Sequence, residues 1–366
     1  MTIQPVLRKT FLRLTLSLSS ILLVLLSLEC TAMLYESRLA NGSDGWELVA
    51  TRRLQVVPSG NPAINSLLRP NMEYTWEGIP VHINSHGLRD EEHDFAKKDG
   101  VYRILALGDS VAFGWEVRLE DSYAKRLEAL LRTRGDRTFE VINAGVPGWD
   151  QPIELAYLQQ TGIKYSPDLI IAEVTVSNDI YHTVFQTPPP SIRNWLLEHT
   201  YFWGYQEYMR WRIRRYTARP DAILQSSLGI PSSPGYPFPV DRNDPVWDEY
   251  IRTPLLRMAQ ESRDIGAEFL VLIVPMSDQV EPERYPVTPQ EIVKKLGDEH
   301  NIHVLDLLPV YRDMYLRSRG KEVAEDGSSA ALFVDSFHHP SALAHRLTAG
   351  AIYKAVQDYD LLRKMR

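Results

Sequence analysis

Residues that can carry out nucleophilic chemistry follow the apolar runs of this sequence. Ser110 comes directly after the first run, Asn178 after a later one, and Asp335 and His338 precede the last helical stretch. A serine hydroxyl is a weak nucleophile until a base accepts its proton, and an imidazole held by a carboxylate is suited to that task. Ser110, His338 and Asp335 are therefore a candidate catalytic triad.

Acyl transfer also needs hydrogen-bond donors aimed at the tetrahedral intermediate. The Ser110 amide, a glycine amide from the tight loop at 143–148 and the Asn178 side chain are three candidates. One such donor is typically worth about a hundredfold to a thousandfold in rate. Together these residues are the parts of an acyl-transfer site.

The chain that must position these residues alternates short apolar runs with helical stretches from about residue 100 onward. Near-continuous Val, Ile and Leu runs separated by helices are typical of a parallel sheet covered on both faces. We predict strands at 102–108, 139–145, 167–176, 267–275 and 302–307, and helices at 121–134, 151–163, 246–265, 289–300 and 341–362. In such sheets ligands bind beyond the carboxyl ends of the strands, where the candidate residues stand.

Four blocks in this order resemble the SGNH (GDSL-type) hydrolase superfamily, which is named for their Ser, Gly, Asn and His. The resemblance covers about residues 100–360 and implies an α/β fold: a flavodoxin-like three-layer sandwich with a five-stranded parallel sheet. It implies that Ser110 is the nucleophile, His338 the base and Asp335 its orienting partner. It implies no metal and no organic cofactor.

The same resemblance assigns the oxyanion donors to Ser110, Gly148 and Asn178, with Gly145 as the second choice for the glycine. The chain departs from the family pattern at Val176, where the family usually has a glycine. That departure affects the geometry of the loop and leaves the asparagine in place.

Several other polar residues have simpler interpretations. We expect Asp109 and Asp179 to fix their own loops by hydrogen bonds, because short acidic side chains bond readily to nearby main-chain amides. His339 adjoins His338, but the Asp-x-x-His spacing favours His338, so we expect His339 at the rim of the site. His345 lies beside the apolar stripe of the last helix and is expected to be structural.

Three more histidines and one arginine precede the catalytic blocks. The spacing of His82, His86 and His93 matches no standard zinc site. Asn84, Gly87 and Arg89 form an Asn-x-x-Gly-x-Arg element, a layout that resembles bacterial membrane-anchored or exported SGNH proteins. We expect Arg89 to be a structural ion-pair partner.

Composition narrows the class of protein. The 366 residues are 44% hydrophobic, which is enough for a substantial core, and the net charge of −7 comes without any long basic block. Nucleic acid is therefore not an expected partner, since phosphate binding needs clustered Lys and Arg. Cys30 is the only cysteine, so the chain can form no internal disulfide.

The N-terminus predicts membrane attachment or export. Arg8, Lys9 and Arg13 precede an uncharged stretch at 14–28, and Glu29 follows it. This charge order predicts a catalytic domain outside the cytoplasm. An uncleaved anchor that continues to residue 34 is favoured, and a signal peptide that is removed, leaving a secreted or periplasmic protein, is the alternative.

We divide the chain into three parts. Residues 1–34 are the signal anchor or signal peptide, 35–99 an extended or β-rich lead-in, and 100–366 the hydrolase domain. A hairpin is expected over 80–93, with Gly87 at its turn. An aromatic insertion at about 181–245 interrupts the domain, and we expect it to lie over or beside the site.

The residues therefore predict a serine-dependent acyl-ester hydrolase, and the resemblance to membrane-anchored or exported SGNH proteins implies that it acts on an acylated carbohydrate or another cell-surface ester. Its partners would be a small acyl ester or an acylated glycan, and the membrane. An O-acetyltransferase that modifies an exported polysaccharide uses the same residues and is the first alternative. A catalytically inactive, glycan-binding protein of the same fold is the second.

Overall fold

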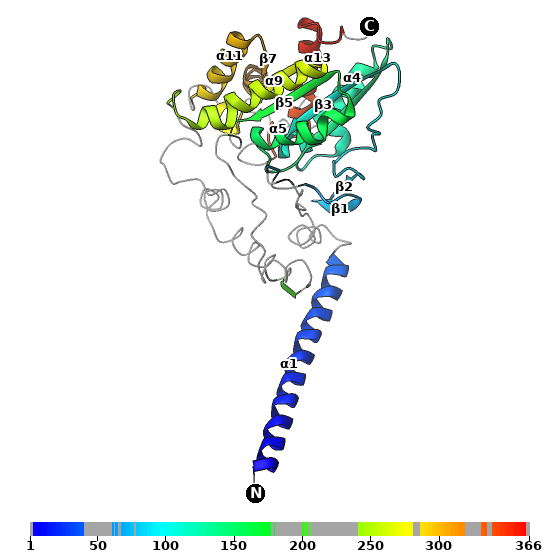
Figure 1. Ribbon diagram of the computed structural model, residues 1–366. Coiled ribbons are helices and arrows are strands. Elements are labelled where there is room, and N and C mark those ends of the chain that lie inside the picture. Colours follow the sequence, from blue (N-terminus) through cyan, green and yellow to red (C-terminus); the bar gives the residue numbers. More distant parts are fainter. Residues whose placement is uncertain are drawn as a thin grey trace. The chain divides into compact units, whose positions relative to one another are not determined.

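The computed structural model of the chain is shown in Figure 1. It describes residues 3–39, 61, 63–64, 67–76, 78–176, 179, 200, 202–203, 206, 241–280, 286–318, 331–334 and 339–363. Asn178, Asp335 and His338 lie outside the described residues, as does most of the insertion at 181–245.

Five parallel strands form the central sheet, as the sequence predicts. Their order is β4-β3-β5-β6-β7. The strands are β3 (Val101–Gly108), β4 (Thr138–Gly145), β5 (Leu169–Thr175), β6 (Glu268–Val274) and β7 (His303–Asp306). Every residue of β3 and β5 is buried, which explains why these strands are mostly apolar on both faces instead of alternating.

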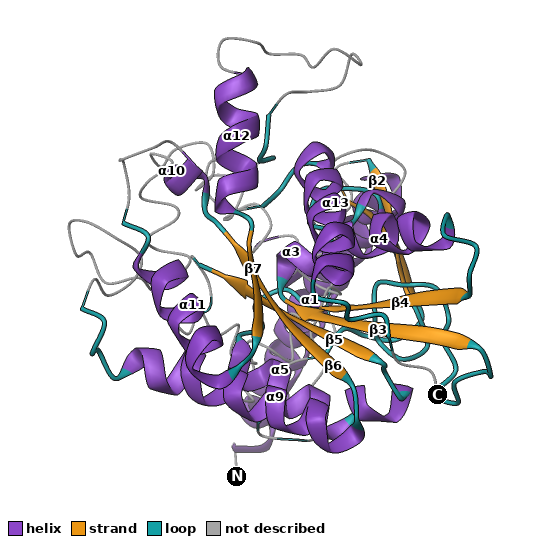
Figure 2. Cartoon of the chain, turned by 90° about the horizontal axis from the view of Figure 1, so that it is seen from above, coloured by secondary structure: helices purple, strands orange, loops and turns teal. Residues whose placement is uncertain are grey.

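Helices cover both faces of this sheet (Figure 2). On one side lie α4 (Tyr123–Arg132), α12 (Leu308–Ser318) and α13 (Ala342–Asp358), and on the other α5 (Gln151–Gln160), α9 (Thr253–Ile265) and α11 (Thr288–His300). Short elements join them: α3 (Ser110–Phe113), η1 (Leu119–Asp121), η2 (Gly162–Tyr165), the π-helical turn η3 (Asp248–Arg252) and α10 (Ser277–Val280). The predicted three-layer α/β architecture is confirmed.

Polar side chains mark where the main helices begin. Ser122 accepts a hydrogen bond from the Lys125 amide at the start of α4, and Asp150 accepts one from the Ile153 amide at the start of α5. Each satisfies an amide that has no partner within its helix. These caps fix where α4 and α5 leave the edge of the sheet that carries Ser110.

The N-terminal helix α1 (Ile3–Leu39) contains an apolar stretch long enough to cross a membrane. That stretch, Phe11–Leu34, has 24 residues and a mean hydropathy of 2.1. Four hydroxyl side chains within it donate to the carbonyl four residues earlier, which satisfies their hydrogen-bonding groups inside the helix: Thr15, Ser20, Ser27 and Thr31. The helix is compatible with either a signal anchor or a signal peptide.

The lead-in contains a two-stranded sheet made by β1 (Met72–Trp76) and β2 (Ile79–Ile83). The predicted hairpin over 80–93 is therefore wrong. In that prediction the strand at β2 would pair with a strand after it, whereas in the structure β2 pairs with β1, the strand before it. Gly87 does lie in a tight turn with φ of 77°, but this turn follows the strands. Asn84 forms the turn by accepting hydrogen bonds from the amides of His86 and Leu88.

Candidate active site

Ser110 is the first residue of α3 and follows β3 after a single residue, Asp109. The Oδ1 atom of Asp109 accepts a hydrogen bond of 2.7 Å from the Val111 amide, which confirms that this aspartate fixes its own loop. The turn is tight: a Cβ at Gly108 would lie 2.6 Å from the Cβ of Ala112. Sharp turning at the strand end therefore places the serine at the carboxyl edge of the sheet.

The amides that follow Ser110 are already occupied. Ala112 donates to Oε1 of Glu173 over 3.1 Å, and Phe113 donates to the Asp109 carbonyl over 3.0 Å. With Val111 bonded to Asp109, the Ser110 amide is left without an acceptor in the described part of the chain. It is thus suited to serve as an oxyanion donor.

His339 lies against the nucleophile. Its Nε2 atom is 2.9 Å from Oγ of Ser110, within hydrogen-bond distance for proton transfer. The expectation that His339 is a rim residue is wrong. His338, the base predicted from spacing, lies outside the described residues together with Asp335.

Main-chain pairing holds His339 in place. Phe333 and Pro340 form an antiparallel bridge, and the Val334 amide donates 2.9 Å to the His339 carbonyl. Pro340 also restricts the residue before it to extended backbone.

Trp115 is a residue of the site that the sequence interpretation did not single out. Its ring stacks on the His339 ring with centroids 5.3 Å apart and planes at 17°. Its amide donates 3.0 Å to the Ser110 carbonyl, so the same residue contacts both members of the Ser-His pair. Trp115 comes five residues after Ser110, and this closeness in the sequence was the only sign that Trp115 belongs to the site.

The glycines of the next loop differ in their hydrogen bonding. The Gly145 amide donates to Oδ1 of Asn143 over 3.1 Å, so it is already used inside the loop. Gly148 has φ of 82°, a conformation that favours glycine, and its amide finds no acceptor among the residues that the structure describes. These observations favour Gly148 over Gly145 as an oxyanion donor.

Buried carboxyl groups lie beneath the nucleophile. Glu154, Glu173 and Asp179 are each at most 1% exposed. Burial raises the pKa of all three groups well above the ordinary values, and the nearby charge of Asp109 raises it further. Burial therefore favours the neutral form of each of these carboxyl groups.

The remaining predicted residues have structural contacts. Asp179 accepts a hydrogen bond from the Thr175 amide over 2.5 Å, which confirms its loop-fixing role. His345 is buried and accepts one from the Tyr123 amide over 3.2 Å, so it is structural as expected. Burial lowers the pKa of His345 to about 3, which keeps the ring neutral.

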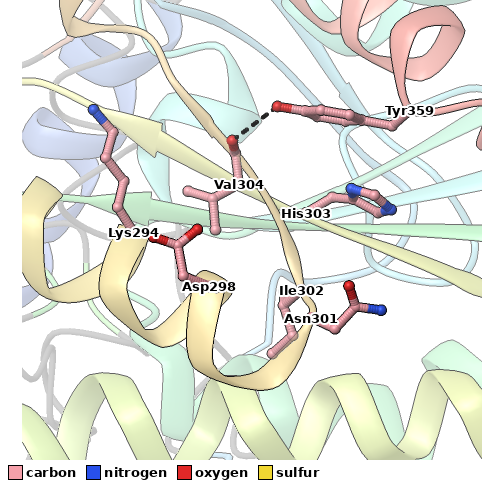
Figure 3. Close-up of a pocket in the computed structure, with 8 residues that line it drawn as sticks. Lys294, Asp298, Asn301, Ile302, His303, Val304 and Tyr359 are labelled. Carbon is pink, nitrogen blue, oxygen red and sulfur yellow. Dashed lines mark hydrogen bonds between the residues drawn. The ribbon is translucent and has the colours of Figure 1, made fainter.

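Two surface cavities lie away from Ser110. One, of about 490 Å³, is shown in Figure 3 and is lined by Lys294, Gly297, Asp298, Asn301, Ile302, His303, Val304 and Tyr359. It adjoins the start of β7, and another of about 700 Å³ adjoins the start of β3. Because the strands are parallel, both lie at the edge of the sheet opposite to Ser110.

Comparison with known proteins identifies the family of this chain. The model of the GDSL-like lipase/acylhydrolase family matches residues 106–347, and this chain belongs to that family. Membership of the family makes the protein an ester-bond hydrolase. No curated protein is significantly similar to the chain.

Solved structures with a similar fold include three esterases or lipolytic proteins. The acetyl xylan esterase AlAXEase has 14% identity and a TM-score of 0.42, covering 69% of this chain and 99% of its own. Axe2, an acetylxylan esterase from Geobacillus stearothermophilus, has 16% identity and a TM-score of 0.42, covering 70% and 94%. A putative lipolytic protein of the G-D-S-L family from Desulfitobacterium hafniense has 15% identity and a TM-score of 0.39, covering 69% and 98%.

Proposed function

We propose that this protein is a serine esterase in which Ser110 forms an acyl-enzyme and His339 is the general base. The observation that carries the proposal is the 2.9 Å contact between Nε2 of His339 and Oγ of Ser110, at the carboxyl edge of a parallel sheet. His339 takes the place that the sequence interpretation gave to His338.

The reaction proceeds in two halves. His339 accepts the Ser110 proton while Oγ attacks the ester carbonyl carbon, and the protonated ring then donates that proton to the departing alcohol. In the second half His339 accepts a proton from water, the hydroxide oxygen attacks the acyl carbon, and the ring returns the proton to Oγ. The amides of Ser110 and Gly148 and the Asn178 side chain stabilise the oxyanion in both halves.

Asp335 stands four residues before His339 and is the carboxylate that we assign to the other ring nitrogen. Such a group holds the imidazole in one tautomer and stabilises its protonated form. The assignment rests on the nearness of Asp335 to His339 in the sequence and on the need of a Ser-His pair for an orienting partner.

The substrate that we assign is an acylated carbohydrate or another ester at the cell surface. What supports this class is the location: within α1, Arg8, Lys9 and Arg13 precede the uncharged stretch at 14–28 and Glu29 follows it, a charge order that directs the following domain out of the cytoplasm. We assign an anchored protein with an extracytoplasmic catalytic domain.

Labelling and turnover of the purified full-length protein in detergent test this function. A fluorophosphonate probe is expected to label the wild-type protein and not Ser110→Ala, and p-nitrophenyl acetate should be hydrolysed only by the wild type. Labelling that survives Ser110→Ala would exclude Ser110 as the nucleophile. A folded wild-type protein that is neither labelled nor active would favour the inactive, glycan-binding alternative.

A second arm separates hydrolysis from transfer. The protein is incubated with the acetyl ester in the presence and absence of xylan or alginate oligosaccharides, and the products are separated by mass spectrometry. Free acetate at the same rate in both conditions is expected for an esterase. Acetylated oligosaccharide that replaces the acetate would instead establish an O-acetyltransferase.

A further inference from the structure

We propose that Arg89 is a positioning residue for acyl transfer, which holds the turn carrying Ser110 and Trp115 in its reactive conformation. The proposal rests on the function assigned to Ser110 and His339 above. Arg89 belongs to the lead-in and precedes residues 106–347, the part of the chain that the family model matches.

The guanidinium of Arg89 binds three main-chain carbonyls that follow the nucleophile. Nη1 donates to the carbonyls of Phe113 and Gly114 over 3.1 and 2.5 Å, and Nη2 donates to the carbonyl of Val117 over 2.8 Å. Arg89 is 1% exposed, so a substrate cannot reach it. Arg89 must therefore affect the reaction through the chain segment whose carbonyls it binds.

That segment, residues 113–117, has an unusual backbone. Gly114 has φ of 79° and Glu116 has φ of 57°, so two of its five residues are in the left-handed region. A residue with a side chain adopts this conformation at a cost, and it persists only where the surroundings hold it. The carbonyl contacts of Arg89 on both sides of Glu116 provide that restraint.

Both reacting groups depend on the same segment. Trp115 lies within it, stacks on the His339 ring and donates its amide to the Ser110 carbonyl. Arg89 also lies over the Phe113 ring, with its guanidinium carbon 4.9 Å from the ring centroid. A shift of this segment would therefore move the nucleophile and the face against which the base packs.

Arg89 is itself held by buried polar contacts on the lead-in. Asp90, the next residue, is 0% exposed and accepts hydrogen bonds from the Asn143 amide over 2.7 Å and from Nζ of Lys125 over 2.6 Å. On the other side the Asn84 side chain closes the turn that leads to Arg89. The lead-in is thus fastened to the end of β4 beside the arginine.

The geometry of the guanidinium predicts that lysine cannot replace it. Lysine keeps the charge but lacks the planar fork that reaches separate carbonyls at once. Since a displacement of about 1 Å at a reacting group can cost about a hundredfold in rate, we expect Arg89→Lys to label with fluorophosphonate about tenfold to a hundredfold more slowly. The kcat for p-nitrophenyl acetate should fall by a similar factor, with little change in KM, because Arg89 does not touch the substrate.

Arg103 offers a matched control. It is also buried, at 2% exposure, and it also binds main-chain carbonyls, those of Asp94, Phe95 and Tyr165. It lies near the start of β3, at the edge of the sheet opposite to Ser110. Arg103→Lys is expected to lower the melting temperature while its folded fraction is labelled at the wild-type rate.

The measurement is the second-order rate constant of labelling in full-length protein, corrected for the folded fraction by thermal melting. A wild-type rate in folded Arg89→Lys would overturn the positioning role, whereas loss of labelling in Ser110→Ala tests the proposed function separately. Should Arg89→Lys not fold, Gly114→Ala perturbs the same contact, because a Cβ there would lie 3.3 Å from Nη1 of Arg89. Unchanged labelling of folded Gly114→Ala would equally contradict the proposal.

Rescue distinguishes positioning from general destabilisation. Glycine adopts the left-handed conformation of Glu116 without a steric cost. We therefore expect Glu116→Gly to restore part of the labelling rate in the Arg89→Lys background. A double variant that regains thermal stability but not labelling would contradict the restraint of residues 113–117 as the way in which Arg89 acts, whereas labelling that returns only in proportion to stability would assign Arg89 a merely structural role.

Discussion

At the scale of single residues, the site depends on which of two adjacent histidines reaches Ser110. The Asp-x-x-His spacing favours His338, whereas the structure places Nε2 of His339 at 2.9 Å from Oγ of Ser110. Spacing along the chain therefore does not decide between adjacent residues, whereas the contact between His339 and Ser110 in the folded chain does.

Exchange of each histidine for glutamine tests this assignment. His339→Gln should lower kcat/KM for p-nitrophenyl acetate by about a hundredfold to ten-thousandfold, because it removes the general base. His338→Gln is the matched control and should stay near the wild-type rate. If His338→Gln instead lost most of its kcat/KM and His339→Gln kept it, His338 would be the base.

At the same scale, the buried acid Glu154 makes stability depend on pH. Its side chain is 0% exposed, and burial raises its pKa well above the ordinary value of 4.5. As pH rises through that ordinary value, the unfolded chain releases the proton while the folded chain retains it or holds an unfavourable charge. The free energy of unfolding is therefore reduced above about pH 4.5 and unaffected below it.

Glu154→Gln removes this titration. We expect the variant to be more stable than the wild type at pH 8 by about 1–3 kcal/mol, and the difference to disappear as pH falls through the ordinary glutamate range. Urea unfolding at the two ends of this range measures it. Glu299→Gln, an exposed glutamate paired with Lys295 on α11, should change stability by less than about 1 kcal/mol. Equal stability of Glu154→Gln and wild type at pH 8 would contradict the argument.

At the scale of elements, the site requires α3 to lie unusually close to the end of β4. A Cβ at Gly145 would lie 2.2 Å from the Phe113 nitrogen, closer than nonbonded atoms allow. The neighbour is main chain, so it can move only if α3 moves. Gly145 is thus needed for the packing of the nucleophile helix, while its amide is bonded to Asn143.

Gly145→Ala is expected to destabilise the protein by about 1–3 kcal/mol, as other overpacked sites do, and to slow fluorophosphonate labelling of the folded fraction. Gly350→Ala is the control, since Gly350 lies within α13 and an added Cβ would meet nothing within 4 Å. That variant should be more stable by about 0.5–1 kcal/mol. If Gly145→Ala kept the wild-type labelling rate and stability, the prediction would be wrong, because α3 would then tolerate the displacement that the added Cβ causes.

Most elements could be predicted from the sequence because their causes are local. Apolar runs predicted the five strands of the central sheet, and the stretches between them predicted the helices, whose starts the structure shows to be capped by residues such as Ser122 and Asp150. Helix α12 was missed because only Leu308 and Tyr311 of its residues are buried, which leaves a weak apolar periodicity. The predicted hairpin failed because β2 pairs with the strand before it.

At the scale of the whole molecule, α1 bears on where the chemistry takes place. Its 24-residue apolar stretch is long enough to span a bilayer, and Arg8 and Lys9 precede it while Arg13 is its third residue. An anchored protein would present its catalytic domain at the membrane surface. A cleaved signal peptide would instead release that domain.

Expression of the full chain in a bacterial host distinguishes these outcomes. We expect the protein to stay in the membrane pellet after alkaline carbonate extraction and to retain Met1–Leu34 by intact-mass analysis. Protease added to spheroplasts should digest the catalytic domain, and a cytoplasmic marker protein should survive the same treatment. A soluble product that lacks the first 32 residues or so would establish cleavage.

The sequence alone determined the parallel sheet, the edge at which chemistry occurs and Ser110 as the candidate nucleophile. These features follow from the pattern of apolar residues and from the residues next to the strand ends. Short stretches of the chain are therefore enough to predict them. Only the tertiary structure decided that His339 contacts Ser110, that Trp115 stacks on it and that Arg89 binds the carbonyls beyond the nucleophile. Those contacts join segments up to 229 residues apart, and no local pattern specifies which atoms meet when such segments pack together.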